Sequence, residues 1–153
     1  MKTSAGILLY RQLGHEPEVL LVHPGGPFFA RKDAGWWTIP KGEYTDEETA
    51  QDAAIREFEE ETGYRPAGPF RELGSIRQKG GKTVYCWAAA GDFDTNQLHS
   101  NTFTIEWPPR SGKQASFPEV DRAEWMSVDT ARGKINEQQA AFLDRLMALL
   151  ASQ

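Results

Sequence analysis

Four glutamates crowd into the last turn of a predicted helix over residues 46–62: Glu57, Glu59, Glu60 and Glu61. The C-terminal end of a helix carries partial negative charge, so each acid there costs about 0.3–1 kcal/mol. Neighbouring acids also repel one another. Three of the four, Glu57, Glu60 and Glu61, have the spacing i, i+3 and i+4, so their side chains converge on one side of one turn.

A divalent cation among these carboxylates would offset the repulsion. Mg²⁺ takes oxygen ligands and commonly binds through a few carboxylates together with substrate phosphates, and Mn²⁺ is a possible substitute. Arg56 lies eight residues beyond Glu48, so its guanidinium can pair with Glu48 or hold one of the glutamates in place. The alternative interpretation is a solvated acidic face, which is the usual role of a charge run.

The helix that carries these acids has sequence signals at both ends. Thr45 is expected to cap its N-terminus, with Glu48 as the capping-box partner. Gly63 is a natural left-handed terminator. A narrow apolar stripe, which would let the helix lie close to a sheet, consists of Ala50, Ala53, Ala54 and Phe58.

Apolar, partly β-branched runs predict the strands around this helix. The runs over 4–11 and 18–24 are expected to pair, and further strands are expected over 70–77, 82–93 and 123–128. The segment 101–119 begins like a strand and breaks at two consecutive prolines.

The C-terminal part of the chain is expected to be helical. A helical turn should follow residue 128 and end near Gly133, and a final helix should open at Asn136, with Gln139 as its capping-box partner. Its apolar residues recur at helical spacing and are expected in the core: Phe142, Leu143, Leu146, Leu149 and Leu150. Strands interleaved with two substantial helices predict an α/β fold, with a mixed sheet covered on both faces.

Composition limits the classes of function. The 153 residues are expected to form a single domain, 1–153, with a net charge of −5 and a pI near 5.2. This balance argues against bulk binding to nucleic acid or to an anionic membrane. No stretch approaches the roughly 18 apolar residues of a membrane span. Cys86 is the only cysteine, so a reducing, cytoplasmic setting is the default expectation.

The spacing of the acidic helix resembles the Nudix box, GX5EX7REUXEEXGU, in which U is a bulky aliphatic residue. All seven invariant positions are occupied, by Gly42, Glu48, Arg56, Glu57, Glu60, Glu61 and Gly63. Phe58 and Tyr64 depart from the pattern, because they are aromatic at the U positions. The segments "SAGILLYR", "WWTIPKGE", "GKTVYCWAA" and "FPEVDRAEWM" are similar to the diadenosine-tetraphosphate hydrolase branch, and the whole chain resembles bacterial Nudix proteins described as predicted nucleoside-triphosphate pyrophosphohydrolases.

The resemblance implies a Nudix-type α/β/α sandwich, with a mixed β-sheet between helices, and a set of metal ligands. By position, Glu57, Glu60 and Glu61 would bind Mg²⁺ together with the main-chain carbonyl of Lys41. The diadenosine-tetraphosphate branch has a further, distal glutamate at the metal site, six residues before a tryptophan. In this sequence that position is Glu119. Its competitor is Glu124, directly before Trp125. The catalytic residues would be Glu57 or Glu60 as general base, with Arg56 orienting rather than reacting, and Gly42, Glu48 and Gly63 structural.

Cations and aromatic residues outside the acidic helix could bind a nucleotide. Lys41 matches a lysine thought to contact phosphate in the related hydrolases, and Lys82 and Arg31 are further candidates, as are Lys32, Lys79, Arg110 and Lys113. Tyr85 lies on the strand that supplies a base-stacking aromatic in those hydrolases, and Trp87 would share its sheet face. Phe29 and Trp37 are candidates in the loop over 25–37, and a core role is open for each aromatic residue.

These observations predict a Mg²⁺-dependent Nudix hydrolase that cleaves a phosphoanhydride bond in a nucleoside diphosphate linked to a moiety X. Dinucleoside polyphosphates such as diadenosine tetraphosphate are the first choice of substrate. A house-cleaning nucleoside-triphosphate pyrophosphohydrolase, an RNA 5′-pyrophosphohydrolase and a non-catalytic nucleotide-binding module are the alternatives. The acidic pI disfavours RNA, because tracking a nucleic-acid backbone requires a positive groove. The oligomeric state is left open.

Overall fold

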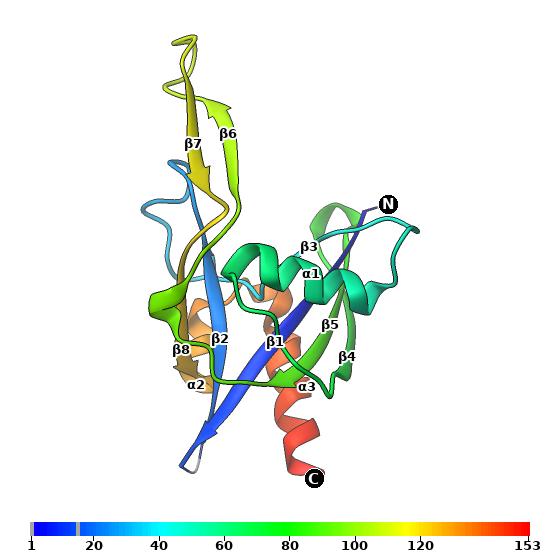
Figure 1. The fold of residues 1–153 in the computed structure, drawn as a ribbon. Coiled ribbons are helices and arrows are strands. Elements are labelled where there is room, and N and C mark those ends of the chain that lie inside the picture. Colours follow the sequence, from blue (N-terminus) through cyan, green and yellow to red (C-terminus); the bar gives the residue numbers. More distant parts are fainter. Residues whose placement is uncertain (1, 15) are drawn as a thin grey trace.

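A mixed six-stranded sheet is the central layer of the protein, whose computed structural model describes residues 2–14 and 16–153 (Figure 1). Its strand order is β4-β5-β1-β2-β8, and the short β3 pairs with the first part of β1. The central strand β1 runs parallel to β5, whereas the other neighbours are antiparallel. The strands are β1 (Thr3–Leu13), β2 (Glu16–Pro24), β3 (Lys41–Glu43), β4 (Arg71–Arg77), β5 (Thr83–Ala90) and β8 (Val120–Ser127).

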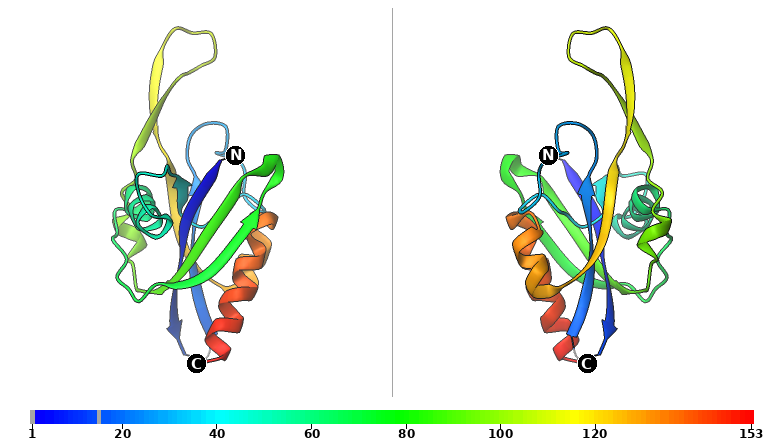
Figure 2. Two further views of the ribbon diagram at one scale, coloured as in Figure 1. Left: turned by 90° about the vertical axis from the view of Figure 1, so that its right-hand side faces the viewer. Right: turned by 90° about the vertical axis from the view of Figure 1, so that its left-hand side faces the viewer.

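Helices cover both faces of this sheet, as the sequence predicts. Helix α1 (Ala50–Thr62) lies on one face, and α2 (Val128–Lys134) and α3 (Ala140–Ala151) lie on the other (Figure 2). Because side chains alternate across a strand, β1 serves two cores: Ile7 packs toward α1 and Leu8 packs toward α3. The expected stripe of α3 is buried at Phe142, Leu143 and Leu146 and partly buried at Leu149 and Leu150.

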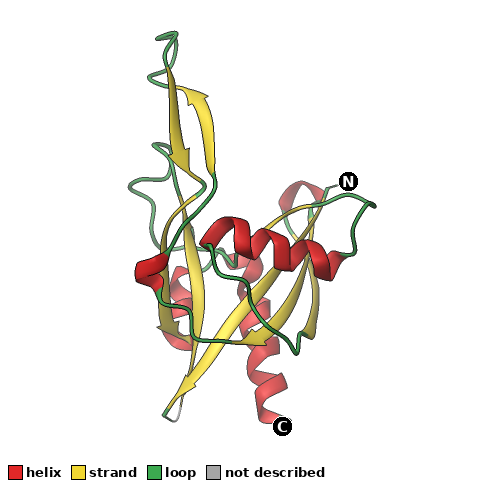
Figure 3. Ribbon diagram, viewed as in Figure 1, coloured by secondary structure: helices red, strands yellow, loops and turns green. Residues whose placement is uncertain are grey.

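A separate two-stranded hairpin projects from the body of the molecule (Figure 3). It consists of β6 (Thr102–Glu106) and β7 (Gln114–Pro118), paired from Thr102 opposite Pro118 to Glu106 opposite Gln114. The two prolines that interrupt segment 101–119 lie in the turn at its tip. Short 3-10 turns occur at Lys79–Gly81, Thr95–Gln97 and Glu137–Gln139. No helix in the described residues is both long and apolar enough to cross a membrane.

The predicted start of the acidic helix is wrong. The helix begins at Ala50, and its cap is Thr49, whose side chain accepts the Asp52 N–H at 3.1 Å. The Thr45 side chain accepts the Glu47 N–H at 3.3 Å, in the turn before the helix. The helix ends at Thr62, and Gly63 has a φ of 82°, as predicted.

The predicted cap of the final helix is also wrong in detail. Asn136 caps a 3-10 turn by accepting the Gln138 N–H at 2.9 Å, and α3 follows at Ala140. The side chain of Gln139 does not reach back along its helix. It is fully buried, and it accepts the Ile39 N–H at 3.1 Å across the core.

Candidate functional site

Three parts of the fold meet at the last turn of α1: this turn, the start of β3 and the foot of the β6–β7 hairpin. The Asn101 N–H donates to the carbonyl of Glu60 at 2.8 Å, and the Glu119 N–H donates to the carbonyl of Asn101 at 2.8 Å. Two backbone bonds therefore connect the acidic turn to Glu119, although the chain separates them by about 60 residues. Burial is the main cause of the raised pKa values of Glu57 and Glu61, and the charge of Glu119 at this foot raises both further.

The carboxylate of Glu57 lies against the backbone of β3. A side chain added at Gly42 would place its Cβ inside the Glu57 carboxyl group. The glycine of the motif is thus required for a close approach, because any Cβ would displace this carboxylate. This approach places Glu57 beside the Lys41–Gly42 peptide, whose carbonyl is one of the predicted ligands.

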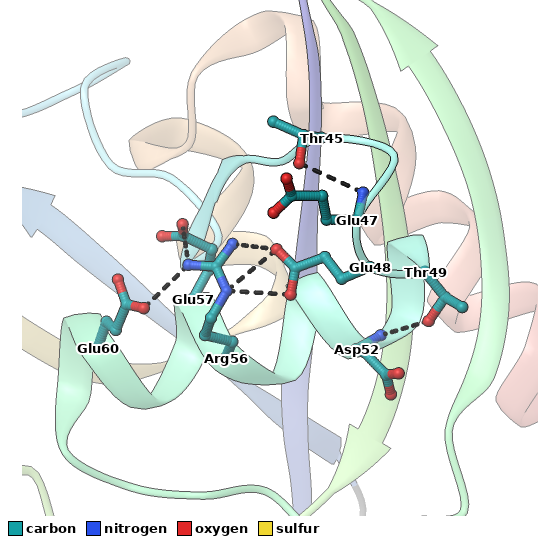
Figure 4. A network of polar contacts seen from close by, with 8 residues as sticks. All are labelled: Thr45, Glu47, Glu48, Thr49, Asp52, Arg56, Glu57 and Glu60. Carbon is teal, nitrogen blue, oxygen red and sulfur yellow. Dashed lines mark hydrogen bonds and ion pairs between the residues drawn. The ribbon is translucent and has the colours of Figure 1, made fainter.

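Arg56 holds three carboxylates at once (Figure 4). Its Nη2 lies 2.5 Å from Glu48, and its Nη1 lies 2.9 Å from both Glu57 and Glu60. Hydrogen bonds from Arg56 lower the pKa of Glu48, and the carboxylates, Glu48 first, raise the pKa of the guanidinium. The sequence left open whether Arg56 pairs with Glu48 or with the converging glutamates, and the structure shows both.

The acidic cluster is short of positive charge. Burial, followed by the charges of Glu57 and Glu119, raises the pKa of Glu61 to about 8. Burial is also the main reason why the pKa values of Glu57 and Glu119 are raised. Lys41, which touches the cluster, has a lowered pKa because of burial and then the charge of Lys82. Each raised carboxyl pKa shows that the negative form is disfavoured as the site stands.

The donor set fits a hard divalent cation. Carboxylate and backbone oxygens are the ligands that Mg²⁺ prefers, and a dication would relieve the repulsion that raises the carboxyl pKa values. As the side chains stand in the described residues, no three acidic, histidine or cysteine groups already form a metal cluster. Figure 4 shows the carboxylates of Glu57 and Glu60 hydrogen bonded to Arg56.

The two candidates for the distal acid lie in different surroundings. Glu119 is at the foot of the hairpin, where burial and the charge of Glu60 raise its pKa. Glu124 is exposed on β8, between Ala123 and Trp125, which both pack toward α1. By strand alternation Glu124 points to the opposite side of the sheet. The structure therefore groups Glu119, and not Glu124, with the acids of α1.

A family model of the NUDIX domain matches residues 1–146 of this sequence. The chain belongs to the NUDIX domain family. It is 33% identical over 105 residues to the 8-oxo-(d)GTP phosphatase of Mycolicibacterium smegmatis, a match that covers 65% of this chain and 26% of that protein. A Caenorhabditis elegans protein named as a nudix hydrolase is 32% identical over 108 residues, covering 67% and 27%. The chain thus spans about a quarter of the length of these curated relatives.

Solved Nudix structures share the fold. The C. elegans Ap4A hydrolase in a binary complex has a TM-score of 0.69 at 23% identity, and the match covers 100% of both chains. The NUDIX domain of Shewanella oneidensis NrtR, complexed with ADP ribose, has a TM-score of 0.66 at 17% identity, covering 97% of this chain and 87% of that one. These likenesses are consistent with the Nudix α/β/α sandwich that the sequence predicts.

The predicted phosphate-binding cations lie in two places. Lys41 and Lys82 are close together, and Lys41 lies beside Glu57 and Glu61. Lys82 forms an ion pair with Glu43 at 3.7 Å. Arg31 lies in the exposed loop over 25–37. Glu43 is not among the residues predicted from the sequence, because its strand of three residues is too short to show a periodic pattern.

The predicted stacking residues differ in accessibility. Tyr85 and Trp87 are half-buried on the α1 face of β5, and Trp87 packs against the core there. Trp37 is 2% exposed, and its indole N–H donates to Asp33 at 2.8 Å, so of the two roles left open for it the structure shows the core role and not stacking. Phe29 is half-buried against Trp36, with ring centroids 5.6 Å apart.

Proposed function

We propose that this Nudix protein is a Mg²⁺-dependent hydrolase of a phosphoanhydride bond in a nucleoside diphosphate linked to a moiety X, and that X is a second nucleotide, as in diadenosine tetraphosphate. The observation that carries the proposal is the grouping of Glu57, Glu60, Glu61 and Glu119 at the last turn of α1. Within this group Glu57 lies against Gly42, and Glu61 is hydrogen bonded to the backbone of Lys41. The full-length structural likeness to a protein named as an Ap4A hydrolase supports the choice of substrate.

In this proposal the ion would be held by carboxylates of Glu57, Glu60, Glu61 and Glu119 and by the carbonyl of Lys41. When bound, a divalent ion neutralises phosphate charge and lowers the pKa of a water molecule. Nudix hydrolases generally use divalent metals, and either Mg²⁺ or Mn²⁺ suits these oxygen donors.

The proton of the attacking water is assigned to Glu57 or Glu60. The carboxylate of Glu57 lies against the backbone of β3 and is held by Arg56, so its position is fixed by two contacts. Arg56 positions both carboxylates through its hydrogen bonds and does not itself react. The cations of Lys41 and Lys82 would attract the phosphate chain to this end of the sheet.

A second candidate is a nucleoside-triphosphate pyrophosphohydrolase. It is favoured by the 33% identity to a protein named as an 8-oxo-(d)GTP phosphatase. Both candidates use the same acidic turn, so the substrate depends on groups outside the motif.

Chromatographic product analysis distinguishes these functions. The purified protein with Mg²⁺ is incubated with diadenosine tetraphosphate, canonical and oxidised triphosphates, sugar nucleotides and capped RNA. Conversion of the tetraphosphate to ATP and AMP supports the proposal. Release of pyrophosphate from oxidised triphosphates alone favours the second candidate, and binding without turnover across the whole panel indicates a non-catalytic module.

A further inference from the structure

One face of the β6–β7 hairpin is apolar and half-exposed. Alternation along the strands places these half-buried residues on it: Phe103, Ile105, Trp107, Ala115 and Phe117. The opposite face is polar, and Thr104 and Ser116 share a hydrogen bond of 2.8 Å there. An isolated two-stranded hairpin is only marginally stable in water, so its apolar face needs a partner.

The loop over 25–37 covers only part of this face. The Gly25 N–H donates to the carbonyl of Glu119 at 2.9 Å, and the ring of Phe103 lies directly over Gly26. Farther along the hairpin, Phe28 meets Trp107 edge to face, with centroids 5.4 Å apart and planes at 81°. Phe28 is nevertheless 61% exposed. An open aromatic corner therefore lies between the loop and the hairpin.

Cationic residues flank this corner along the chain, in the loop after Phe28 and in the hairpin turn after Trp107. Throughout residues 2–14 and 16–153, Arg31, Arg110 and Lys113 form no ion pair. The one acid at the tip is occupied, because Glu106 accepts the backbone N–H groups of Arg110 and Gly112 at 3.2 and 3.0 Å. These interactions fix the tip and leave its two cationic side chains available to an anion.

The length of the hairpin strand sets the distance between the aromatic corner and the acidic turn of α1. Asn101, at the foot of the hairpin, is bonded to Glu60, and six residues of extended chain separate it from Trp107. At roughly 3.3 Å per residue, Trp107 is about 20 Å from the turn. Figure 1 shows the end of α1 at the foot of the hairpin, with the loop beside its stem. This separation suits a base joined to the cleaved bond through a ribose and a chain of phosphates.

We propose that Phe28 and Trp107 stack the distal base of a dinucleoside polyphosphate whose cleaved bond lies at the acidic turn. This inference rests on the proposed function and names the residues that would recognise X. Bases stack well on aromatic side chains, whatever their identity, and the flanking cationic residues favour the attached phosphates. A nucleoside monophosphate with its phosphate at the acidic turn would be too short to reach the corner.

The test compares two ligands in variants of this corner. Trp107→Ala and Phe28→Ala should each raise the KM for diadenosine tetraphosphate about tenfold. The inhibition constant of AMP, whose base is only one phosphate away from the cleaved bond, should change far less when AMP is measured as a competitive inhibitor of the same reaction. Trp107→Phe should restore most of the loss, since it retains a stacking ring. Thr104→Ala, on the polar face of the hairpin, is the control and should match the wild type, and melting temperatures verify folding.

The outcomes separate this inference from the proposed function. If the wild type does not cleave any dinucleoside polyphosphate, the proposed function fails and the inference fails with it. If it does and the aromatic variants keep the wild-type KM, or lose AMP binding equally, the inference alone is wrong. If the aromatic substitutions impair only the cleavage of triphosphorylated or capped RNA, the hairpin recognises RNA and the inference is also wrong.

Discussion

The carboxylate of Glu57 occupies the space in which a side chain at Gly42 would begin. Gly42→Ala should therefore displace Glu57 from the β3 backbone without removing any acid from the site. Misplacing a catalytic group by about 1 Å can cost roughly a hundredfold in rate, so we expect turnover to fall ten- to a hundredfold. Steady-state kinetics with the best substrate of the panel measures this loss.

The same substitution elsewhere is the control. Gly133, in α2, has open space where a Cβ would be added. Gly133→Ala should keep full activity and should stabilise the protein by about 0.5–1 kcal/mol, because alanine favours a helix. Full activity in Gly42→Ala would show that the position of Glu57 is unimportant for the reaction.

Neighbouring glutamates on one helix turn should differ sharply in effect. Glu57→Gln and Glu60→Gln each remove a carboxylate that Arg56 holds in the site, and turnover should fall by about two decades or more. Glu59 is exposed and pairs with Arg65 at 3.3 Å, outside the acidic cluster. Glu59→Gln should stay within about twofold of the wild type. Rates like the wild type in both Glu57→Gln and Glu60→Gln would remove the basis for the assignment.

Local spacing explains what the sequence could predict. The i, i+3 and i+4 acids, the left-handed Gly63 and the apolar stripe of α3 each depend on residues within a few turns of one helix. The contacts that complete the site are long-range and use the backbone. Asn101 connects Glu60 to Glu119 through its peptide group, and a peptide group has no residue-specific signal.

The start of the acidic helix was predicted wrongly for a different reason. Two threonines could each cap its N-terminus. Thr45 with Glu48 and Thr49 with Asp52 have the same spacing, so either pair reads as a helix start. Tertiary contacts decide between them. Glu48 pairs with Arg56 and cannot serve as a capping partner, whereas the Thr49 side chain accepts the Asp52 N–H.

This difference can be measured as stability. Thr49→Ala removes the side-chain cap of α1 and should lower the free energy of unfolding by about 1 kcal/mol. Thr45→Ala removes only a bond of 3.3 Å in an exposed turn, and it should cost less than half as much. Urea unfolding of the two variants gives both values. A larger loss in Thr45→Ala would place the functional cap one turn earlier than the structure does.

The two distal acids give a matched pair of variants. Glu119→Gln removes a carboxylate from the acidic cluster, so we expect turnover to fall at least tenfold and the Mg²⁺ concentration for half-maximal activity to rise. Glu124→Gln changes an exposed residue on the other side of the sheet and should have no effect on either quantity. Titration of activity with Mg²⁺ measures both, and the reverse pattern would transfer the distal role to Glu124.

Glu61 should make the stability of the metal-free protein depend on pH. Its pKa is raised from 4.5 to about 8 in the folded protein, mainly by burial, so between these values the folded state keeps a proton that the unfolded chain has lost. The unfolded state then binds fewer protons, and the free energy of unfolding falls as pH rises through this window. Lys41 acts in the opposite direction at higher pH, because burial lowers its pKa.

Mg²⁺ should reverse this loss, because it binds the charged form of a carboxylate and so stabilises the folded protein more as pH rises. The rise in melting temperature on adding Mg²⁺, measured below and above about pH 8, tests the effect. Glu61→Gln should flatten the pH dependence and reduce the Mg²⁺ shift, whereas Glu47→Gln, at an exposed position before α1, should leave both unchanged. A Mg²⁺ shift that is equal at both pH values in the wild type would show that Glu61 does not take part in binding the ion.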